Sequence, residues 1–435
     1  MEKLLIALED RFTAAIEPYW APIVTAANRR IAIDQYLIYS SVLAVFLMQL
    51  LAHKGIDIFL GYPLIMVNMI ILFNLNRLII HRNHIAIVAA VAAISFIASA
   101  NSSTPGLSIV AQIMGILFFS TYFFSVLTNS GLSVPRWIQI YAHFALAIVV
   151  MGFVLYVLRR LHLFPADKEF RLRSIYQEPS LFIYMTLPAF GIYANAYLRN
   201  RVYKLEVCLF FFAYVLADSA LGFLGMLLIA FFALLPRLSL WKMVGFGFSA
   251  FGALVALFFA SANFRLRVVD TAVSIARMNF GAANASTFAF LSNAYVTIQT
   301  FMNYPLLGVG IGGYQYQYTK YVSDIGADLT DPNLINLNMY DASSMFFRTT
   351  AEFGLLGLVV LIGFLVVFSR VKGDQHVDIR NALLPYLLVR MSRLGAWFSV
   401  EIYFFLGLFV LNYLHSRASY GTRKLPLATD QPGTL

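Results

Sequence analysis

A succession of apolar segments, each close to the length of a membrane-spanning helix, constrains this chain more than any other feature. A helix needs about 20 residues to cross the hydrocarbon core of a bilayer. Sixty per cent of the 435 residues are hydrophobic and 12% are charged, whereas soluble proteins carry about a quarter charged residues. The sequence therefore predicts an all-α polytopic membrane protein with about 12 transmembrane helices. The apolar segments lie at residues 35–52, 58–73, 85–100, 107–127, 138–158, 181–198, 205–217, 219–236, 243–262, 354–369, 381–396 and 398–414.

Two of these segments are weaker candidates for spans than the others. The seventh is short and ends at Asp218, and the eleventh contains Arg390 and Arg393. Because charged side chains are costly to bury in hydrocarbon, a count of about 10 or 11 spans stays open.

The positions of Lys and Arg predict the orientation, because basic residues are enriched in cytoplasmic loops. Most basic clusters fall on one side of the predicted membrane, together with both termini. We therefore expect this side and both termini to be cytoplasmic. The predicted units are a cytoplasmic interfacial segment at residues 1–34, spans one to nine at 35–262 with a periplasmic loop at 159–180, a large helical periplasmic loop at 263–353, the last three spans at 354–414, and a disordered cytoplasmic tail at 415–435.

The two predicted periplasmic loops are unusually basic for that side of a membrane. Residues 159–180 contain five basic and three acidic side chains, and the large loop contains Arg265, Arg267, Arg277 and Arg348. Any one of these arginines is more often a headgroup anchor or the partner of a nearby carboxylate. Taken together on one face, however, they predict an anionic ligand.

Arginine suits a phosphate or pyrophosphate, because its planar guanidinium donates two hydrogen bonds at once and keeps its charge. An internal ion pair, such as Arg393 with Glu401, is the competing interpretation for arginines beside spans. The candidate pyrophosphate-binding or glycan-binding residues are Arg171, Arg173, Arg277, Arg348, Arg390 and Arg393.

Carboxylates near these arginines are candidates for a general base that accepts a proton from a sugar hydroxyl. Glu178 and Asp341 are the first choices. Glu352 and Asp218 follow, and for these two a structural role is the more frequent one.

Three glycines, Gly308, Gly310 and Gly313, spell the G-x-G-x-x-G pattern of dinucleotide-binding turns. Such a site also needs a preceding strand and a following helix in a parallel sheet, but here the glycines follow Pro305 in the outer loop of a membrane protein. The pattern therefore predicts a turn that shapes the loop. No D-x-D pair or P-loop is present and the seven histidines are scattered, so we predict neither a metal nor another cofactor.

The stretch "NYPLLGVGIGGYQ", followed by "SSMFFRTTAEFGLLGL", resembles the signature of the O-antigen ligase and O-antigen polymerase superfamily of bacterial membrane proteins. Residues 305–314 and 352–358 carry the resemblance. "RLRSIYQEPSLF" is similar to a stretch of polymerase-type members, which points to Arg173, Glu178, Pro179 and Ser180. "LVRMSRLGAWF" is similar to a stretch near the polymerase C-terminus. Ligase-type members have a histidine where this chain has Ser343 and Ser344, and the arginine common before the glycine turn is replaced by Asn293.

The resemblance implies a metal-independent glycosyltransferase in the bacterial inner membrane that acts on its periplasmic face. Its donor would be a glycan on undecaprenyl pyrophosphate, and its acceptor the terminal sugar of another lipid-linked repeat unit. Membrane lipids are the expected surroundings, and a chain-length regulator stays open as a protein partner. The alternatives are a ligase that transfers the glycan to lipid A core and a transporter or flippase without chemistry.

Overall fold

The computed structural model describes residues 28–47, 60–102, 104–163, 171–234, 240–260, 262–277, 285–325 and 335–422. Within these residues the chain is helical and contains no β-strand, which confirms the predicted all-α class. Residues 1–27 of the predicted interfacial segment 1–34 and residues 423–435 of the predicted disordered tail 415–435 lie outside the described residues. Residues 28–34 and 415–422 are helical, so the last described helix extends into the region predicted as a disordered tail. The helices are α2 (Asn28–Phe46), α3 (Gly61–Asn74), α4 (Arg82–Ser102), α5 (Gly106–Asn129), α6 (Val134–Arg160), α7 (Pro179–Asn200), α8 (Lys204–Ala217), α9 (Ala220–Leu234), α10 (Leu240–Ala260), α11 (Ala262–Arg277), α12 (Ala285–Asn303), α13 (Tyr314–Tyr321), the 3-10 turn η3 (Val322–Ile325), α15 (Met345–Phe368), α16 (Asp374–Arg393) and α17 (Val400–Thr422).

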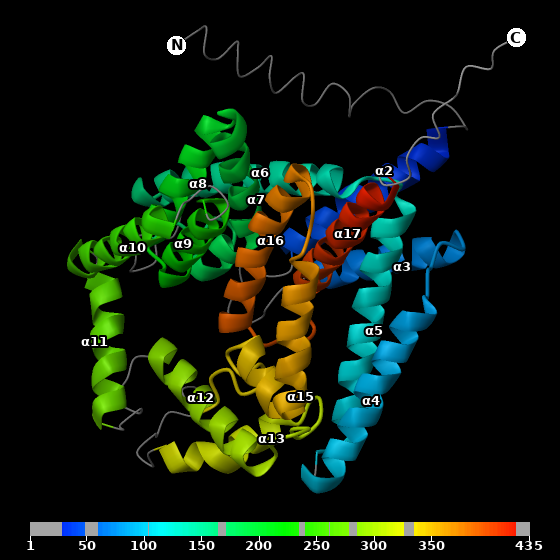
Figure 1. Cartoon of the computed structure of the whole chain (residues 1–435), viewed down its shortest axis with the longest axis vertical. Helices are drawn as coiled ribbons and strands as arrows, with labels where there is room; N and C mark the ends of the chain where they lie inside the picture. The colour runs from blue at the N-terminus through cyan, green and yellow to red at the C-terminus, as the bar shows by residue number, and fades with distance from the viewer. Residues whose placement is uncertain are drawn as a thin grey trace, which may run out of the picture.

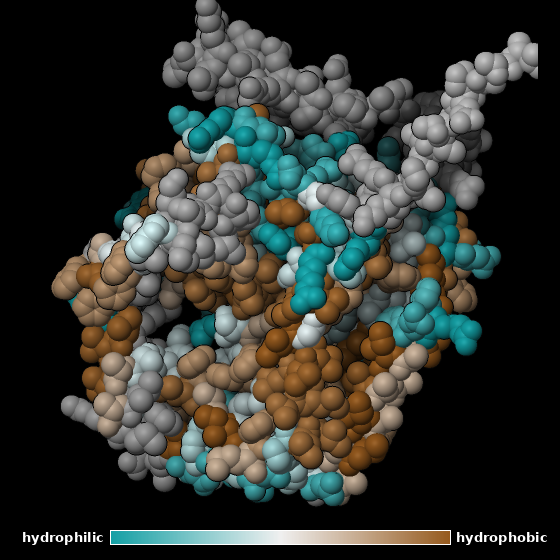
Figure 2. Space-filling model, viewed as in Figure 1, coloured by the Kyte–Doolittle hydropathy of each residue, from teal (hydrophilic) through white to brown (hydrophobic). Residues whose placement is uncertain are grey.

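Five of the described helices are long and apolar enough to cross a membrane: α4, α5, α6, α7 and α15. Shorter apolar helices lie at Ile33–Phe46, Gly61–Asn74 and Ala220–Leu234. Hydrophobic side chains cover much of the middle of the face in view, while hydrophilic ones gather toward its upper end (Figure 2). The protein is therefore an α-helical membrane protein, and the count of about 12 spans stays a prediction.

The main hydrophobic core is built around α7, which packs against α6, α8, α9 and α16. Proline at the first position of α7 fits this place, because a helix needs no backbone N–H donor there. The α7 helix is the most buried of the five long apolar helices. The packing of α7 therefore also fixes the position of the residues just before its N-terminal end.

A second, smaller core lies in the predicted outer loop. It joins α12, α13 and the start of α15, at the opposite end of the molecule from the start of α2 and the end of α17 (Figure 1). The buried residues of this core are Val296, Tyr314, Tyr318, Ile325, Ala342 and Ala351. The loop is thus a small helical unit packed on the membrane bundle.

The last helix of this unit, α15, continues into the apolar segment that was predicted to begin at residue 354. It begins earlier, at Met345, where the Ser344 hydroxyl accepts a hydrogen bond from the Phe347 amide at 3.3 Å. Gly354 interrupts the helix with φ 59° and ψ −147°, a conformation open almost only to glycine. The polar start of α15, which belongs to the smaller core, and its apolar remainder therefore share one kinked helix.

Candidate functional site

In the segment of residues 171–178, before α7, the side chains of residues 172, 174 and 176 are buried, while those of residues 171, 173, 177 and 178 line a cavity. Leu172, Ser174 and Tyr176 are fully buried, while Arg171 and Arg173 are half-buried. The Leu172 amide donates to the Leu216 carbonyl at 3.0 Å, and the Ser174 hydroxyl donates to the Ile148 carbonyl on α6 at 2.8 Å. These bonds hold the segment in a fixed register, so both arginines point the same way.

This segment forms one wall of a cavity of about 730 Å³, within the size range of pockets that hold a small molecule. The cavity lies between the bundle of α7, α9 and α16 and the helix pair α11 and α12, where the visible face of the molecule is hollowed (Figure 2). The lining residues are Arg171, Arg173, Gln177, Glu178, Pro179, Ser180, Ser219, Ala220, Leu221, Leu224, Thr271, Ser286, Thr287, Phe290, Ser392 and Arg393.

Four of the predicted site residues meet in this cavity: Arg171, Arg173, Glu178 and Arg393. Three arginines and one carboxylate give its described lining a formal charge of +2 (3 − 1). A guanidinium nitrogen of Arg173 donates to the Gln177 carbonyl at 2.8 Å, and one of Arg171 lies 3.5 Å from the Asp218 carbonyl oxygen. Glu178 is exposed and accepts a hydrogen bond from the Ser180 hydroxyl at 2.8 Å. The cavity is thus positively charged, as an anionic ligand requires.

Arg348 and Arg390 were also predicted to bind the pyrophosphate or glycan. Both are instead buried against the backbone between α16 and α17. Arg390 is fully buried and donates to the Leu394 carbonyl, to the Ala396 carbonyl at 2.9 Å and to the Ser399 hydroxyl at 2.7 Å. Arg348 donates to the Gly395 carbonyl at 3.0 Å. Within the described residues, neither side chain lines the cavity. Both fix the connection that follows Arg393.

Glu401, the suggested partner of Arg393, pairs with Arg390 instead, with 3.6 Å between Oε1 and Nε. The Tyr184 hydroxyl donates to the same carboxylate oxygen at 3.3 Å. Arg390 and Glu401 are both buried, and a buried ion pair needs such additional hydrogen bonds to offset its loss of water. The pair therefore belongs to the packing between α7, α16 and α17.

Glu352 lies at the meeting point of three segments and has no exposed surface. Its Oε1 accepts from the Gly312 amide at 2.9 Å and from Arg348 Nε at 3.0 Å, and its Oε2 accepts from Trp397 Nε1 at 2.7 Å. The carboxylate thereby joins the glycine turn, α15 and the connection between α16 and α17. Both of its carboxylate oxygens accept hydrogen bonds from protein donors. This indicates that Glu352 holds the three segments in position.

Asp341 lies beside the connection between α16 and α17, and within the described residues it does not line the cavity. A Cβ atom on Gly395 would come 1.5 Å from the Asp341 carbonyl oxygen, so the two backbones touch. Burial raises the pKa of the Asp341 carboxyl, and the Ser343 amide and the charges of Arg348 and Arg393 lower it in part. The carboxyl thus lies within electrostatic range of both Arg348 and Arg393.

The glycine turn packs directly on the kink of α15. The Val309 and Gly310 amides donate to the carbonyls of Ala351 and Glu352 at 3.0 and 2.9 Å, and the Leu355 amide donates to the Pro305 carbonyl at 2.8 Å. Gly308 and Gly310 have φ values of 66° and 82°, and a Cβ atom on either would lie 2.4 or 2.6 Å from backbone atoms. Gly313 has an ordinary negative φ and packs against Thr104. The turn therefore shapes the unit of α12, α13 and the start of α15, and within the described residues it does not line the cavity.

Several cavity residues carried no signal in the sequence. Gln177 and Ser392 adjoin residues that were singled out. The remaining polar and aromatic lining comes from helices without a motif, namely Thr271, Ser286, Thr287 and Phe290. The side chain of Arg277 lies outside the described residues. Among the described side chains, no group of three or more His, Cys, Asp or Glu residues could hold a metal ion.

No family model and no curated protein matches this chain, so its function is inferred from the cavity and the side chains around it.

Proposed function

We propose that the protein is a polysaccharide polymerase, a membrane glycosyltransferase that transfers a glycan from undecaprenyl pyrophosphate to the terminal sugar of a second lipid-linked repeat unit. One observation supports this above all: Arg393 follows Arg171 and Arg173 by more than 200 residues, yet all three line one cavity with Glu178. Their guanidinium groups suit a pyrophosphate. The proposal that a glycan is transferred rests on the resemblance to the O-antigen ligase and O-antigen polymerase superfamily.

In the proposed reaction, a hydroxyl oxygen of the acceptor sugar forms a bond to the anomeric carbon of the donor. The bond between that carbon and the pyrophosphate oxygen breaks, and its electron pair leaves with the pyrophosphate. The arginines stabilise the charge that develops there. The hydroxyl proton passes to a carboxylate, for which Glu178 is the first candidate because it lines the cavity. Asp341, beside Arg393, is the second.

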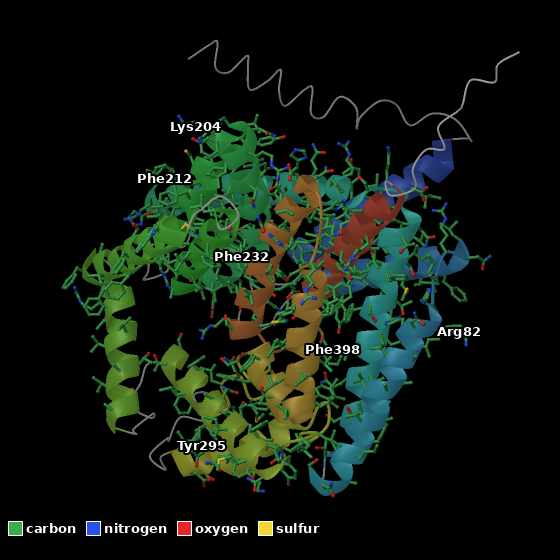
Figure 3. The ribbon with its side chains drawn as sticks, in the orientation of Figure 1. Arg82, Lys204, Phe212, Phe232, Tyr295 and Phe398 are labelled. Atoms are coloured by element: carbon green, nitrogen blue, oxygen red, sulfur yellow. The ribbon has the colours of Figure 1, made fainter. Side chains whose placement is uncertain are left out.

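The test is complementation of a strain that lacks the gene, with the length of its surface polysaccharide as the readout. Arg173→Ala and Arg393→Ala should abolish long chains while the proteins still insert in the membrane. Arg82→Ala is the matched control, because Arg82 is exposed at the start of α4, on the opposite side of the molecule from α11 (Figure 3). Normal ladders from both cavity variants would refute a role for these arginines.

The strain without the gene separates the polymerase from its two alternatives. Single repeat units on lipid A indicate a polymerase, whereas accumulated lipid-linked polymer indicates a ligase. Normal amounts and lengths of every surface glycan would rule out both enzymes and leave a transporter of another substrate.

A further inference from the structure

The two walls of the cavity differ in chemistry. The bundle wall, formed by residues 171–180, the start of α9 and the end of α16, contributes every ionisable side chain of the described lining. The opposite wall belongs to α11 and α12 and contributes three hydroxyls and one phenyl ring. We call it the hydroxyl wall, and its residues are Thr271, Ser286, Thr287 and Phe290.

The hydroxyl wall is a built surface. The Thr271 and Thr287 hydroxyl oxygens lie 3.2 Å apart and join α11 to α12 across the wall. Phe290 is 40% exposed, and its ring centroid lies 5.3 Å from that of Phe347 on α15. Because Phe347 supports one side of the ring, Phe290 keeps a free apolar surface toward the cavity.

We propose that the hydroxyl wall binds the sugar ring attached to the donor pyrophosphate and selects for an uncharged sugar; this inference rests on the proposed function. A Ser or Thr hydroxyl both donates and accepts hydrogen bonds, which matches the hydroxyls of a sugar. An aromatic ring offers a rigid apolar surface of large area, which matches the C–H face of a pyranose. Across the cavity, the arginines hold the pyrophosphate.

The same division explains why the charged residues are kept to one wall. A pyrophosphate bound at Arg171, Arg173 and Arg393 leaves the attached sugar facing α11 and α12. A lysine or glutamate on that side would need its own partner once water is expelled, whereas a hydroxyl is uncharged and can both donate and accept hydrogen bonds with a sugar. Leu221 and Leu224, on α9, also line the cavity and give the hydrocarbon chain of the donor an apolar surface.

The test uses two readouts on the full-length protein. The first is the polysaccharide ladder in the complemented strain. The second is binding of farnesyl pyrophosphate, a lipid pyrophosphate without sugar, to the purified protein in detergent. Phe290→Ala should reduce long chains at least about tenfold while the affinity for farnesyl pyrophosphate stays within about twofold of wild type, and Phe290→Tyr should restore the chains. Arg173→Ala should weaken farnesyl pyrophosphate binding at least about tenfold.

A control variant and the contrary outcomes complete the design. Phe212→Ala removes an exposed ring from α8 (Figure 3) that is not part of the described cavity lining, and should change neither readout. A normal ladder from Phe290→Ala would overturn the sugar subsite, as would a loss of farnesyl pyrophosphate binding equal to that of Arg173→Ala. If the wild-type protein did not bind farnesyl pyrophosphate, or if Arg173→Ala bound it equally well, the proposed function would fail instead. Should Phe290→Ala not fold, Phe290→Leu against Phe290→Tyr gives the same comparison.

Discussion

Replacing Glu352 should destabilise the protein, because its buried carboxylate accepts hydrogen bonds from three separate segments. Alanine would leave the Gly312 amide, the Arg348 guanidinium and the Trp397 indole without this acceptor. Removing one partner of a buried ion pair costs about 3–5 kcal/mol, so we expect a loss of about 4 kcal/mol for Glu352→Ala. Glu352→Gln keeps one acceptor oxygen but turns an amide N–H₂ group toward another donor. We expect this substitution to lower the free energy of unfolding by about 2 kcal/mol.

The assay is thermal unfolding of the purified protein in detergent, followed by tryptophan fluorescence. A loss of about 4 kcal/mol lowers the midpoint by several degrees. Glu178→Gln is the matched control, because the Glu178 side chain is exposed with one bond to a hydroxyl, and its midpoint should equal that of wild type. Unchanged unfolding of Glu352→Gln together with complete loss of polymer would refute the positioning role and make Glu352 a catalytic candidate.

Two further predictions concern Asp341 and Gly354. Because burial raises the pKa of the Asp341 carboxyl, the native protein retains that proton to higher pH than the unfolded chain, and this residue's contribution to stability declines as pH rises above about 4. Asp341→Asn should therefore gain stability relative to wild type between about pH 4 and pH 7; an equal difference at both ends of that range would contradict the reasoning. Gly354→Ala should cost at least about 2 kcal/mol, because its φ is positive and a Cβ would lie 2.6 Å from the Pro305 carbonyl oxygen. At Gly363, later in the same helix, an added Cβ would meet no neighbouring part of the protein within 4 Å, so Gly363→Ala should be neutral or stabilising. Equal thermal unfolding midpoints for the two variants would refute the clash at Gly354.

The sequence was sufficient to predict the helical class and to single out four residues that line the cavity. Apolar segments of membrane length require backbone groups that are satisfied internally, so their helical state follows from composition. Arg173, Glu178 and Arg393 were found because ionisable residues beside apolar segments are costly unless they have a role. Together with Arg171, these residues line a single cavity.

The hydroxyl wall and the role of Glu352 could not be predicted in the same way. Serine and threonine are common in helices and produce no pattern when they face a cavity, so Ser286 and Thr287 resembled any other helical hydroxyls. Glu352 was singled out as a possible base, but its three donors come from residues 40 positions earlier, four earlier and 45 later. Only tertiary packing brings such donors together.

The predicted arginines separate into two kinds according to what their donors face. Arg390 directs its terminal nitrogens to the Leu394 and Ala396 carbonyls and the Ser399 hydroxyl, and its Nε lies 3.6 Å from Glu401. A guanidinium has five N–H donors, so little capacity is left for a pyrophosphate. Arg393, three residues later, lines the cavity. Loss of polymer in an Arg390 variant would therefore not identify a ligand, because the connection that holds Arg393 in place would be lost with it.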